Sequence, residues 1–410
     1  MTTHSDPDDV KPVADAATDY NILDKAYIQN PLPTWDDLRQ RCPIAHTERW
    51  GGSWLPTRYE DVQALAKKVP ILSSLSNLVF DLPADLNSTL LTGPIAAAPI
   101  SADPPEQTRT RQALLPHFTR AAAETQRPFT EKTCEDLIDS FIEDGRCDAA
   151  SQYARQLTPQ VLIHLLGVDR DSTSELTHWV SNLLDAGLEG TEWTKYWHLI
   201  RNFFSMEVQD RRSNPRDDFI SALSEAKFGE ELFPEEMVVG MCALQLVAGI
   251  DTTWSVIGSA IWHFATHQHD RQKLVADPTL LNAAVEEMLR FYSPVTAGRN
   301  ALEELTYAGV TFQPGDKVLL NFGAANHDPE VFEDANTFRL DREDNRHIAF
   351  GVGIHRCTGL HLARMEIQVA LQTWFHRIPN FTIEEPETVV WEGGATRGPR
   401  NVPVLFNCRI

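Results

Sequence analysis

One stretch of the chain combines a cysteine, a histidine and an arginine between glycines. Residues 350–359 read FGVGIHRCTG, which places Cys357 directly after Arg356 and two residues after His355. The residues that follow, HLARMEIQVALQTWF, show the apolar spacing of a helix, so Cys357 is expected where a loop turns into a helix N-terminus. That position favours a thiolate, which is a nucleophile and a metal ligand. An isolated cysteine in a polar loop is more often a plain thiol.

The glycines of this loop predict a ligand with a flat face. Gly351 and Gly353 let the backbone turn tightly and approach such a ligand closely, and Gly359 lets the following helix begin against it. Backbone N–H groups beyond Cys357 would point at the sulfur and tune any iron that it binds. The loop therefore suggests an iron–thiolate site as the alternative to a plain thiol.

The pattern F-G-x-G-x-H-x-C-x-G resembles the haem-ligand loop of the cytochrome P-450 family, the haem-thiolate monooxygenases. The resemblance covers most of the chain and implies the P-450 fold, a single helix-rich domain that is mainly α with a minor β portion. It implies haem b as the cofactor and Cys357 as the ligand of its iron. It also implies that Phe350 packs against the sulfur side of the haem.

A second stretch, AGIDTT at residues 248–253, lies in a long apolar helix expected over 234–266. Its ordinary interpretation is a core helix with a polar interruption. The resemblance implies an oxygen-activating groove, in which Gly249 leaves room for dioxygen and Asp251 and Thr252 deliver protons. A threonine hydroxyl can also bond the carbonyl one turn earlier and open the helix locally.

The resemblance further implies that Arg111, Arg299 and His355 hold the haem propionates, since guanidinium groups match carboxylates in bidentate geometry. Taken singly, each arginine would be read as a solvated surface residue. Gln107 stands where many relatives carry a histidine, and it can donate a hydrogen bond but no charge.

The sequence EEMLR places Glu287 three residues before Arg290, a spacing that is common on helix surfaces. The resemblance implies instead a buried structural pair. Its usual third partner would stand at Thr337, which leaves Arg339 or Arg342 to take that place. In AANHDPEVF, His327 stands where relatives often carry arginine.

The family positions that line the substrate site are apolar or small and carry no charge. They are Leu244, Val247, Ala248, Val295, Thr296, Ala395 and Thr396, together with an irregular segment over 70–100. We expect a small, mostly apolar, neutral substrate. Aromatic residues between 179 and 197 are expected either in a lid or, as is more frequent, in the core. They are Trp179, Trp193, Tyr196 and Trp197.

Composition limits the classes of partner. The chain has 410 residues and a formal net charge of -22, so nucleic acid and anionic membranes are not expected to bind it. Six cysteines without a CxxC pair indicate reduced thiols and a cytoplasmic location. The longest uncharged apolar run starts at Met237 and is shorter than the roughly 18 residues of a membrane helix, so a buried core helix is expected.

The acidic, polar composition of residues 1–20 indicates a flexible tail, and the resemblance implies one haem-thiolate monooxygenase domain over 21–410. A strand is expected at 54–56, a helix at 57–68, a small antiparallel sheet within 304–322 and a hairpin over 389–408. Further helices are expected at 105–118, 128–143, 149–166, 172–187, 193–212, 217–225, 234–266, 270–276 and 279–292.

The implied reaction inserts one atom of O2 into a C–H bond of the substrate, as hydroxylation or oxidative demethylation. No flavin or iron–sulfur domain follows the final hairpin, so electrons are expected from a separate ferredoxin and its reductase. Five arginines could form a basic docking site for that ferredoxin, or they could be ordinary solvated surface residues. They are Arg109, Arg120, Arg342, Arg346 and Arg356.

Three alternatives stay open at this point. A peroxide-driven or isomerase-type haem-thiolate enzyme would need no electron donor, although such proteins often lose the acid–alcohol pair that Asp251 and Thr252 form here. A haem-binding sensor would give no product. A helical scaffold without haem would be colourless.

Overall fold

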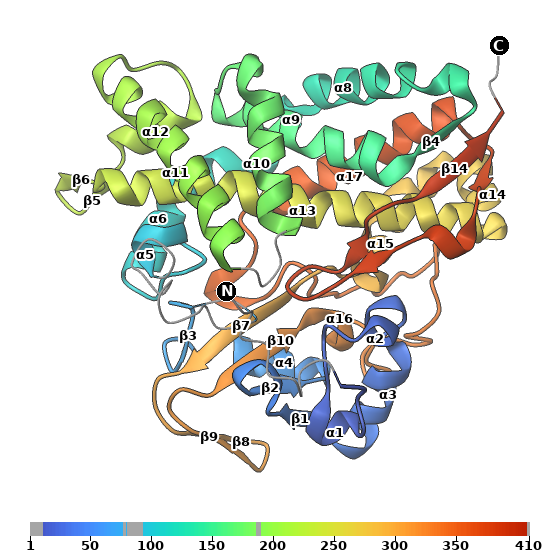
Figure 1. The fold of residues 1–410 in the computed structure, drawn as a ribbon, viewed down its shortest axis with the longest axis horizontal. Coiled ribbons are helices and arrows are strands. Elements are labelled where there is room, and N and C mark those ends of the chain that lie inside the picture. Colours follow the sequence, from blue (N-terminus) through green and yellow to red (C-terminus); the bar gives the residue numbers. More distant parts are fainter. Residues whose placement is uncertain (1–10, 77–78, 80–92, 186–189, 408–410) are drawn as a thin grey trace.

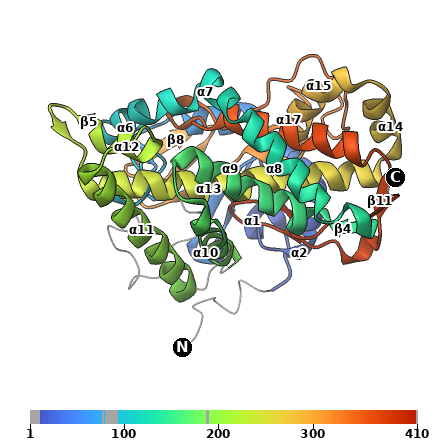
Figure 2. The same cartoon turned by 90° about the horizontal axis from the view of Figure 1, so that it is seen from above.

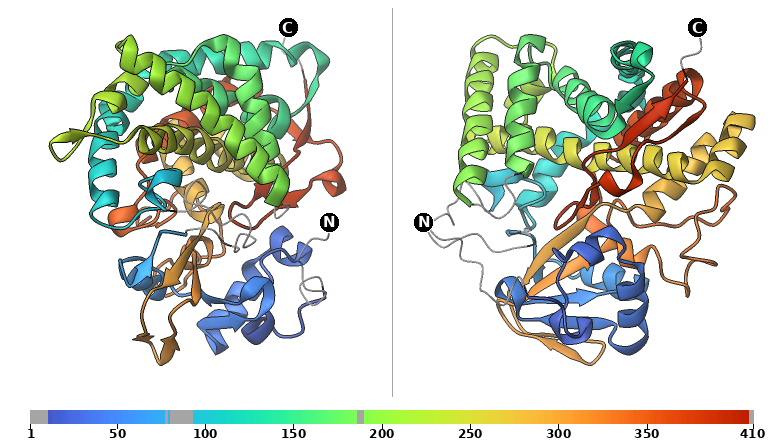
Figure 3. Two further views of the ribbon diagram at one scale, coloured as in Figure 1. Left: turned by 60° about the vertical axis from the view of Figure 1, so that its left-hand side comes forward. Right: turned by 45° about the vertical axis from the view of Figure 1, so that its right-hand side comes forward.

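The computed structural model describes residues 11–76, 79, 93–185 and 190–407. Helices form one side of the molecule, and a small sheet with the N-terminal helices forms the other (Figure 1). Figure 3 shows the same division from two further directions. The described residues therefore agree with the predicted class, mainly α with a minor β portion.

The helical side is organised around α13, Glu235–Thr266, which runs through its middle (Figure 2). Glu235 and Glu236 occupy its first turn, where negative charge complements the helix dipole. The helix contacts α9 (Arg155–Leu166), α11 (Gly190–Ser213) and α17 (Leu360–Arg377). It is long and apolar enough to cross a membrane, yet 72% of its most apolar window is buried inside the protein. The prediction of a buried core helix is confirmed.

Most predicted helices are present with small shifts at their ends. They are α4 (Tyr59–Ala66), α8 (Arg127–Asp139), α10 (Thr173–Asp185), α12 (Phe219–Glu225), α14 (Gln268–Ala276) and α15 (Leu281–Phe291), besides α9, α11, α13 and α17. The predicted helix over 105–118 ends early, because Pro116 lacks the N–H that an α-helix needs. It consists of α6, Glu106–Leu114, and a tighter turn over Leu115–Phe118.

Among the described residues, five helices escaped prediction. Four are too short to show a period: α1 (Ala16–Asp19), α2 (Lys25–Gln29), α7 (Arg120–Thr125) and α16 (Phe322–Ala325). The fifth, α3 (Leu32–Arg41), is longer and begins beside two prolines. Within the predicted tail, residues 1–10 lie outside the described residues. The Tyr20 hydroxyl at the end of that segment hydrogen-bonds Ser53 Oγ at 2.7 Å.

The prediction of a small antiparallel sheet within 304–322 is partly wrong. β8 (Leu305–Tyr307) and β9 (Val310–Phe312) form an antiparallel hairpin, but β10 (Lys317–Asn321) leaves it. β10 lies at the centre of a five-stranded sheet, because all its residues are buried and need partners on both edges. The strand order is β1 (Ile44–Thr47), β2 (Ser53–Pro56), β10, β7 (Thr296–Ala301) and β3 (Leu72–Ser73).

The predicted hairpin over 389–408 is also wrong as a single unit. β12 (Trp391–Glu392) pairs with β13 (Gly398–Pro399), which closes a shorter hairpin. β14 (Pro403–Phe406) pairs instead with β11 (Phe381–Ile383) and β4 (Arg146–Asp148). In the irregular segment over 70–100, the described residues include β3 and α5 (Pro94–Ala97), while 77–78 and 80–92 lie outside the described residues.

His327 follows α16 and is buried with a neutral ring. Its Nδ1 lies 3.0 Å from the Gly323 carbonyl oxygen, and its ring contacts Trp35 and Phe291 at centroid distances of 5.4 and 5.0 Å. Burial, together with the nearby charge of Arg290, lowers the pKa of His327 to about 3. The arginine that relatives carry here is therefore replaced by an uncharged donor.

This burial predicts a pH dependence of stability. The imidazole of an unfolded histidine has a pKa of about 6.5. Below that pH, His327 is protonated in the unfolded state but stays neutral in the folded state. His327 should therefore lower the free energy of unfolding as the pH falls from about 6.5 towards 3, by about 2 kcal/mol at pH 5.

His327→Asn keeps an N–H donor but does not titrate. Urea unfolding at pH 7.5 and pH 5 should show a smaller acid loss for the variant than for the native protein, by about 2 kcal/mol. Equal acid losses in the two proteins would show that His327 accepts its proton while folded.

Candidate active site

The Cys357 loop turns back on itself through two glycines with left-handed backbone. Gly351 has φ +68° and Gly353 has φ +70°, a region that residues with a Cβ seldom adopt. The turn brings the Cys357 N–H to the Phe350 carbonyl at 2.8 Å. Cys357 thus lies at a fixed place just before α17, as the sequence predicted.

The helix start favours a thiolate at Cys357, as expected, but burial opposes it more strongly. Burial raises the pKa of the Cys357 thiol, and the backbone N–H of Gly359 with the guanidinium charges of Arg111, Arg364 and Arg356 offsets only part of that rise. A cation bound directly to the sulfur has a far stronger effect, because a coordinating thiol loses its proton outright. The sulfur suits a metal ligand better than a free nucleophile.

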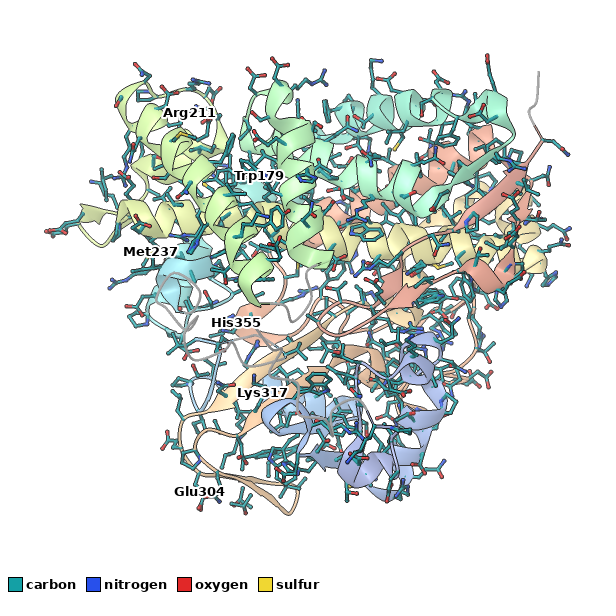
Figure 4. All side chains as sticks on the ribbon, in the orientation of Figure 1. Trp179, Arg211, Met237, Glu304, Lys317 and His355 are labelled. Atoms are coloured by element: carbon teal, nitrogen blue, oxygen red, sulfur yellow. The ribbon has the colours of Figure 1, made fainter. Side chains whose placement is uncertain are left out.

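Near Cys357, two buried ring or guanidinium nitrogens have no hydrogen-bond partner within the described residues. They are Arg299 Nε and His355 Nε2. Burial, together with the charges of Arg299 and Arg111, lowers the pKa of His355 to about 3, so the three groups lie close together and the His355 ring is neutral. Figure 4 shows His355 between the helical side and the sheet. A buried anion with several acceptor oxygens is what these groups require.

Gln107 joins α6 to the loop. It is buried on α6, and its Nε2 donates to the Ile354 carbonyl, one residue before His355, at 2.6 Å. An amide Nε2 carries two N–H groups, so this bond uses one of the two.

On α13, Asp251 and Thr252 make separate contacts. The Thr252 hydroxyl donates to the Ala248 carbonyl one turn earlier at 2.9 Å, as predicted, although α13 runs continuously through this point. Asp251 is buried and accepts from Arg400 at 2.9 Å. Arg400 lies 149 residues away, so nothing local in the sequence signalled this contact.

Gly249 also sets a helix contact. A Cβ at this position would lie 2.7 Å from Leu162 Cδ1, so the missing side chain makes room for α9. The Thr158 hydroxyl of α9 also donates to the Ile250 carbonyl at 3.4 Å. Gly249 and Thr158 therefore set the contact between two helices.

One face of α13 is accessible although most of the helix is buried. We call it the accessible face; its members are Leu244, Val247, Ala248 and Thr252. Residues spaced by four share a helix face, whereas the neighbouring Ile250, Asp251 and Thr253 are buried. The accessible face carries no charge.

The other expected substrate contacts come together at a second place. Val295 forms a β-bridge with Thr396, and the Thr296 N–H donates to the Ala395 carbonyl at 3.0 Å. These side chains are half-buried or exposed. The same segment continues into β7, which carries Arg299.

The aromatic residues that were weighed as a lid pack in the core. Trp197 is buried in the main hydrophobic cluster, and Trp179, Trp193 and Tyr196 pack against it. Trp193 and Trp197 stack at a centroid distance of 5.7 Å. For these described residues, the core-packing interpretation is confirmed.

A surface cavity of about 500 Å³ reaches Cys357. Its walls are largely apolar, with Leu115, Pro116, Phe118 and Leu360 among them. Arg111 lines it, and the charges of Arg364, Arg120 and Arg356 act on the cavity residue His361. A neighbouring cavity of about 460 Å³ is lined by Lys67, Arg346, Arg356 and Arg364, among others.

Of the arginines expected in a docking site, Arg342 does not belong there. Its side chain is 5% exposed and points inward, with its Nε 3.0 Å from Glu287 Oε2. Arg120 and Arg356 are exposed beside the first cavity, Arg346 pairs with Asp344 at 2.7 Å, and Arg109 is exposed on α6.

Glu287 and Arg290 form a fully buried bidentate pair, with both bonds at 2.8 Å. Arg342 supplies the third charge, which decides between the two candidates. Arg339 contributes only its backbone N–H to Glu287, at 2.9 Å, and its side chain pairs with Asp341 at the surface. Arg290 also donates to the carbonyls of Asn326 and Ala335.

Sequence reasoning missed a second network that supports the loop. Arg364 donates to Glu286 at 2.6 and 2.8 Å and lies 4.6 Å above the Phe350 ring. His347 also contacts Glu286, at 3.0 Å. These bonds lower the pKa of Glu286 to about 2 despite the opposing effect of burial. The available signal was Arg364, which lies near the start of α17, seven residues after Cys357.

Comparison with known proteins gives this geometry its context. The family model described as Cytochrome P450 matches residues 189–392. The polyketide biosynthesis cytochrome P450 PksS of Bacillus subtilis (strain 168) is 30% identical over 93% of this chain and 97% of its own length. The mycinamicin IV hydroxylase/epoxidase of Micromonospora griseorubida is 33% identical, and the match covers 91% of this chain and 94% of that protein.

Solved structures agree with the sequence matches. PksS from Bacillus subtilis 168 has a TM-score of 0.86 at 29% identity, and the match covers 95% of this chain and 100% of that chain. P450BioI was solved in complex with acyl carrier protein ligated to hexadec-9Z-enoic acid. It has a TM-score of 0.85 at 27% identity, and the match covers 93% of this chain and 99% of that chain.

The chain belongs to the cytochrome P450 family and has its fold. It is a cytochrome P450 monooxygenase, a haem-iron enzyme that acts with O2 on small molecules. The donor set fits that cofactor, because a sulfur ligand and unsatisfied buried donors converge near one loop.

The Glu287 cluster generates a stability prediction. Glu287→Gln leaves the buried charges of Arg290 and Arg342 without an anion, so urea unfolding should show a loss of about 3–5 kcal/mol. The control is Asp341→Asn, which breaks an exposed pair with Arg339 in the same segment and should barely move the midpoint. Similar midpoints for the two variants would contradict this assignment.

Proposed function

We propose that this protein is a haem b monooxygenase that hydroxylates or oxidatively demethylates a small, mostly apolar molecule with electrons from a separate ferredoxin and reductase. The observation that carries the proposal is the pairing of Cys357 with buried donors that lack acceptors. Cys357 would ligate the iron, and Arg111, Arg299 and His355 would hold the propionates. Phe350, Gly351 and Gly359 would shape the loop around the ring.

Bound haem iron supplies dioxygen activation and C–H oxidation, and the thiolate favours O–O cleavage. The chain's own residues control the protons. Thr252 presents its hydroxyl on the accessible face while bonded to Ala248. Asp251 is the buried acid beside it in sequence and would pass protons inward from solvent.

The side chains proposed to contact substrate are uncharged. Leu244, Val247 and Ala248 on the accessible face would meet one side of the molecule, and two segments would meet the other, Val295–Thr296 and Ala395–Thr396. Similar proteins are named for polyketide biosynthesis and for mycinamicin, and one was solved with an acyl carrier protein. A screen should therefore include macrolactones and fatty acyl chains, both free and carrier-bound.

Electrons would enter through the cavity beside Cys357. Its apolar walls and the exposed Arg120 and Arg356 suit an acidic ferredoxin, although the whole chain carries a charge of -22. We assign residues 21–410 to one catalytic domain and place the enzyme in the cytoplasm, with no nucleic acid or membrane as partner. Five described cysteines are free thiols, in keeping with that location.

The carbon monoxide spectrum of the reduced protein tests the ligand. The native protein should show a thiolate-type red-shifted Soret band, and Cys357→Ser should lose it. Cys42→Ser is the matched control, because Cys42 is a half-buried free thiol on another part of the chain. A globin-like band in folded, haem-loaded native protein would overturn the proposal.

Substrate turnover separates the alternatives. With a binder found by the Soret spin shift, product should form with NADH, ferredoxin and reductase, and not with hydrogen peroxide alone. Product from peroxide alone would indicate a peroxide-driven enzyme. Binding without product under either condition would indicate a sensor.

Neutralising the docking arginines should weaken ferredoxin binding selectively. For Arg120→Gln with Arg356→Gln, we expect the KM for ferredoxin to rise about tenfold with little change in kcat, and the salt dependence to flatten. Arg146→Gln is the control, because Arg146 is exposed on β4. Unchanged KM values would place electron entry elsewhere.

A further inference from the structure

Asp251 is held by a residue that no family pattern in the sequence indicates. Arg400 Nη1 donates to Asp251 Oδ1 at 2.9 Å. The two side chains are 15% and 6% exposed, so the pair is largely shielded from water. Among the described residues, Arg400 is the one cation within salt-bridge distance of Asp251. The carboxylate is therefore turned towards the C-terminal hairpin and makes no hydrogen bond to Thr252.

Arg400 is itself fixed from several sides. Its Nε donates to Glu392 at 2.6 Å, and its guanidinium lies 4.8 Å above the ring of Trp254, on α13. Its backbone N–H donates to the Val390 carbonyl at 2.8 Å. Glu392 is 51% exposed, so the chain of charges runs from solvent through Arg400 to Asp251.

The hairpin that carries Arg400 rests directly on α13. A Cβ on Gly398 would lie 2.5 Å from Ser255 Cβ, so only glycine lets β13 approach this closely. At the other end, the Arg397 N–H donates to the Pro294 carbonyl at 2.8 Å, and the Ala395 carbonyl accepts from Thr296. One short hairpin thus touches both the segment proposed to contact substrate and the acid proposed to move protons.

We propose that Arg400 is a positioning residue that holds the Asp251 carboxylate away from the reacting centre until the hairpin moves. This inference rests on the proposed function. In the held state, the ion pair keeps the carboxylate turned towards Arg400. When the hairpin shifts, the carboxylate takes a proton from solvent, turns and gives it up towards Thr252. It then returns as a carboxylate, so each cycle moves one proton and leaves Asp251 unchanged.

Consumption of NADH without substrate tests this role and needs no knowledge of the substrate. With saturating surrogate ferredoxin and reductase, Arg400→Gln should raise NADH oxidation and peroxide release about tenfold, within the range typical of coupling between sites. Its solvent deuterium isotope effect should move towards unity. Asp251→Asn should lower the rate about a hundredfold.

The double variant decides whether Arg400 acts through Asp251. Arg400→Gln with Asp251→Asn should behave like Asp251→Asn alone, whereas independent roles would give additive effects. Arg400→Lys keeps the charge and should restore the low native rate. Arg397→Gln is the matched control, because Arg397 lies on the same hairpin but bonds Ile28 and covers Trp391.

The outcomes are distinguishable from failure of the proposed function. Native protein without a thiolate-type carbon monoxide band overturns both proposals. Native protein with that band, and an Arg400→Gln variant of normal haem content whose NADH oxidation and isotope effect match those of Arg397→Gln, overturns this inference alone. If Arg400→Gln does not fold, Glu392→Gln removes the outer anchor of Arg400 instead. It should change the rate in the same direction.

Discussion

A sulfur that lies beside buried nitrogen atoms without acceptors is the constraint on which the rest of this structure depends. Burial raises the pKa of the Cys357 thiol, and among the described residues Arg299 Nε and His355 Nε2 have no hydrogen-bond partner. Buried nitrogens without acceptors are costly to a folded protein. Carboxylates at the nitrogens would relieve that cost, and a metal ion at the sulfur would displace its proton. The haem-iron cofactor of this family has that combination of groups.

The loop that carries Cys357 is held by two adjacent glutamates that point to different places. Glu287 binds Arg290 and Arg342 and so fixes the segment before the loop. Glu286 binds Arg364 and His347, and Arg364 in turn covers Phe350. Because one helix, α15, carries both carboxylates, the loop and the start of α17 share a rigid support. Such support is what a metal ligand needs to keep its geometry.

α13 carries both the uncharged residues proposed to contact substrate and the acid proposed to move protons. Its accessible face is uncharged, whereas Asp251 is directed to Arg400 on the C-terminal hairpin. Gly249 and Thr158 set the distance between α13 and α9. A single helix can serve both purposes because neighbouring residues project about a quarter-turn apart.

Sequence patterns were most informative where the chemistry is local. The Cys357 loop, the long apolar helix and the Thr252 back-bond depend on residues a few positions apart, so spacing alone predicted them. Residue-level patterns failed where burial reverses a local preference. The helix N-terminus predicted a thiolate at Cys357, but desolvation outweighs it.

The sequence by itself determined the family, the ligand loop and most helices, because periodicity and loop composition are properties of neighbouring residues. Only the tertiary structure decided the partners. Four contacts join residues that are far apart in the chain. Glu287 pairs with Arg342 and not with the Arg339 side chain, and Gln107 bonds a loop carbonyl. Asp251 pairs with Arg400, and β10 lies in the central sheet. Those choices depend on which surfaces pack together, and packing is a property of the whole fold.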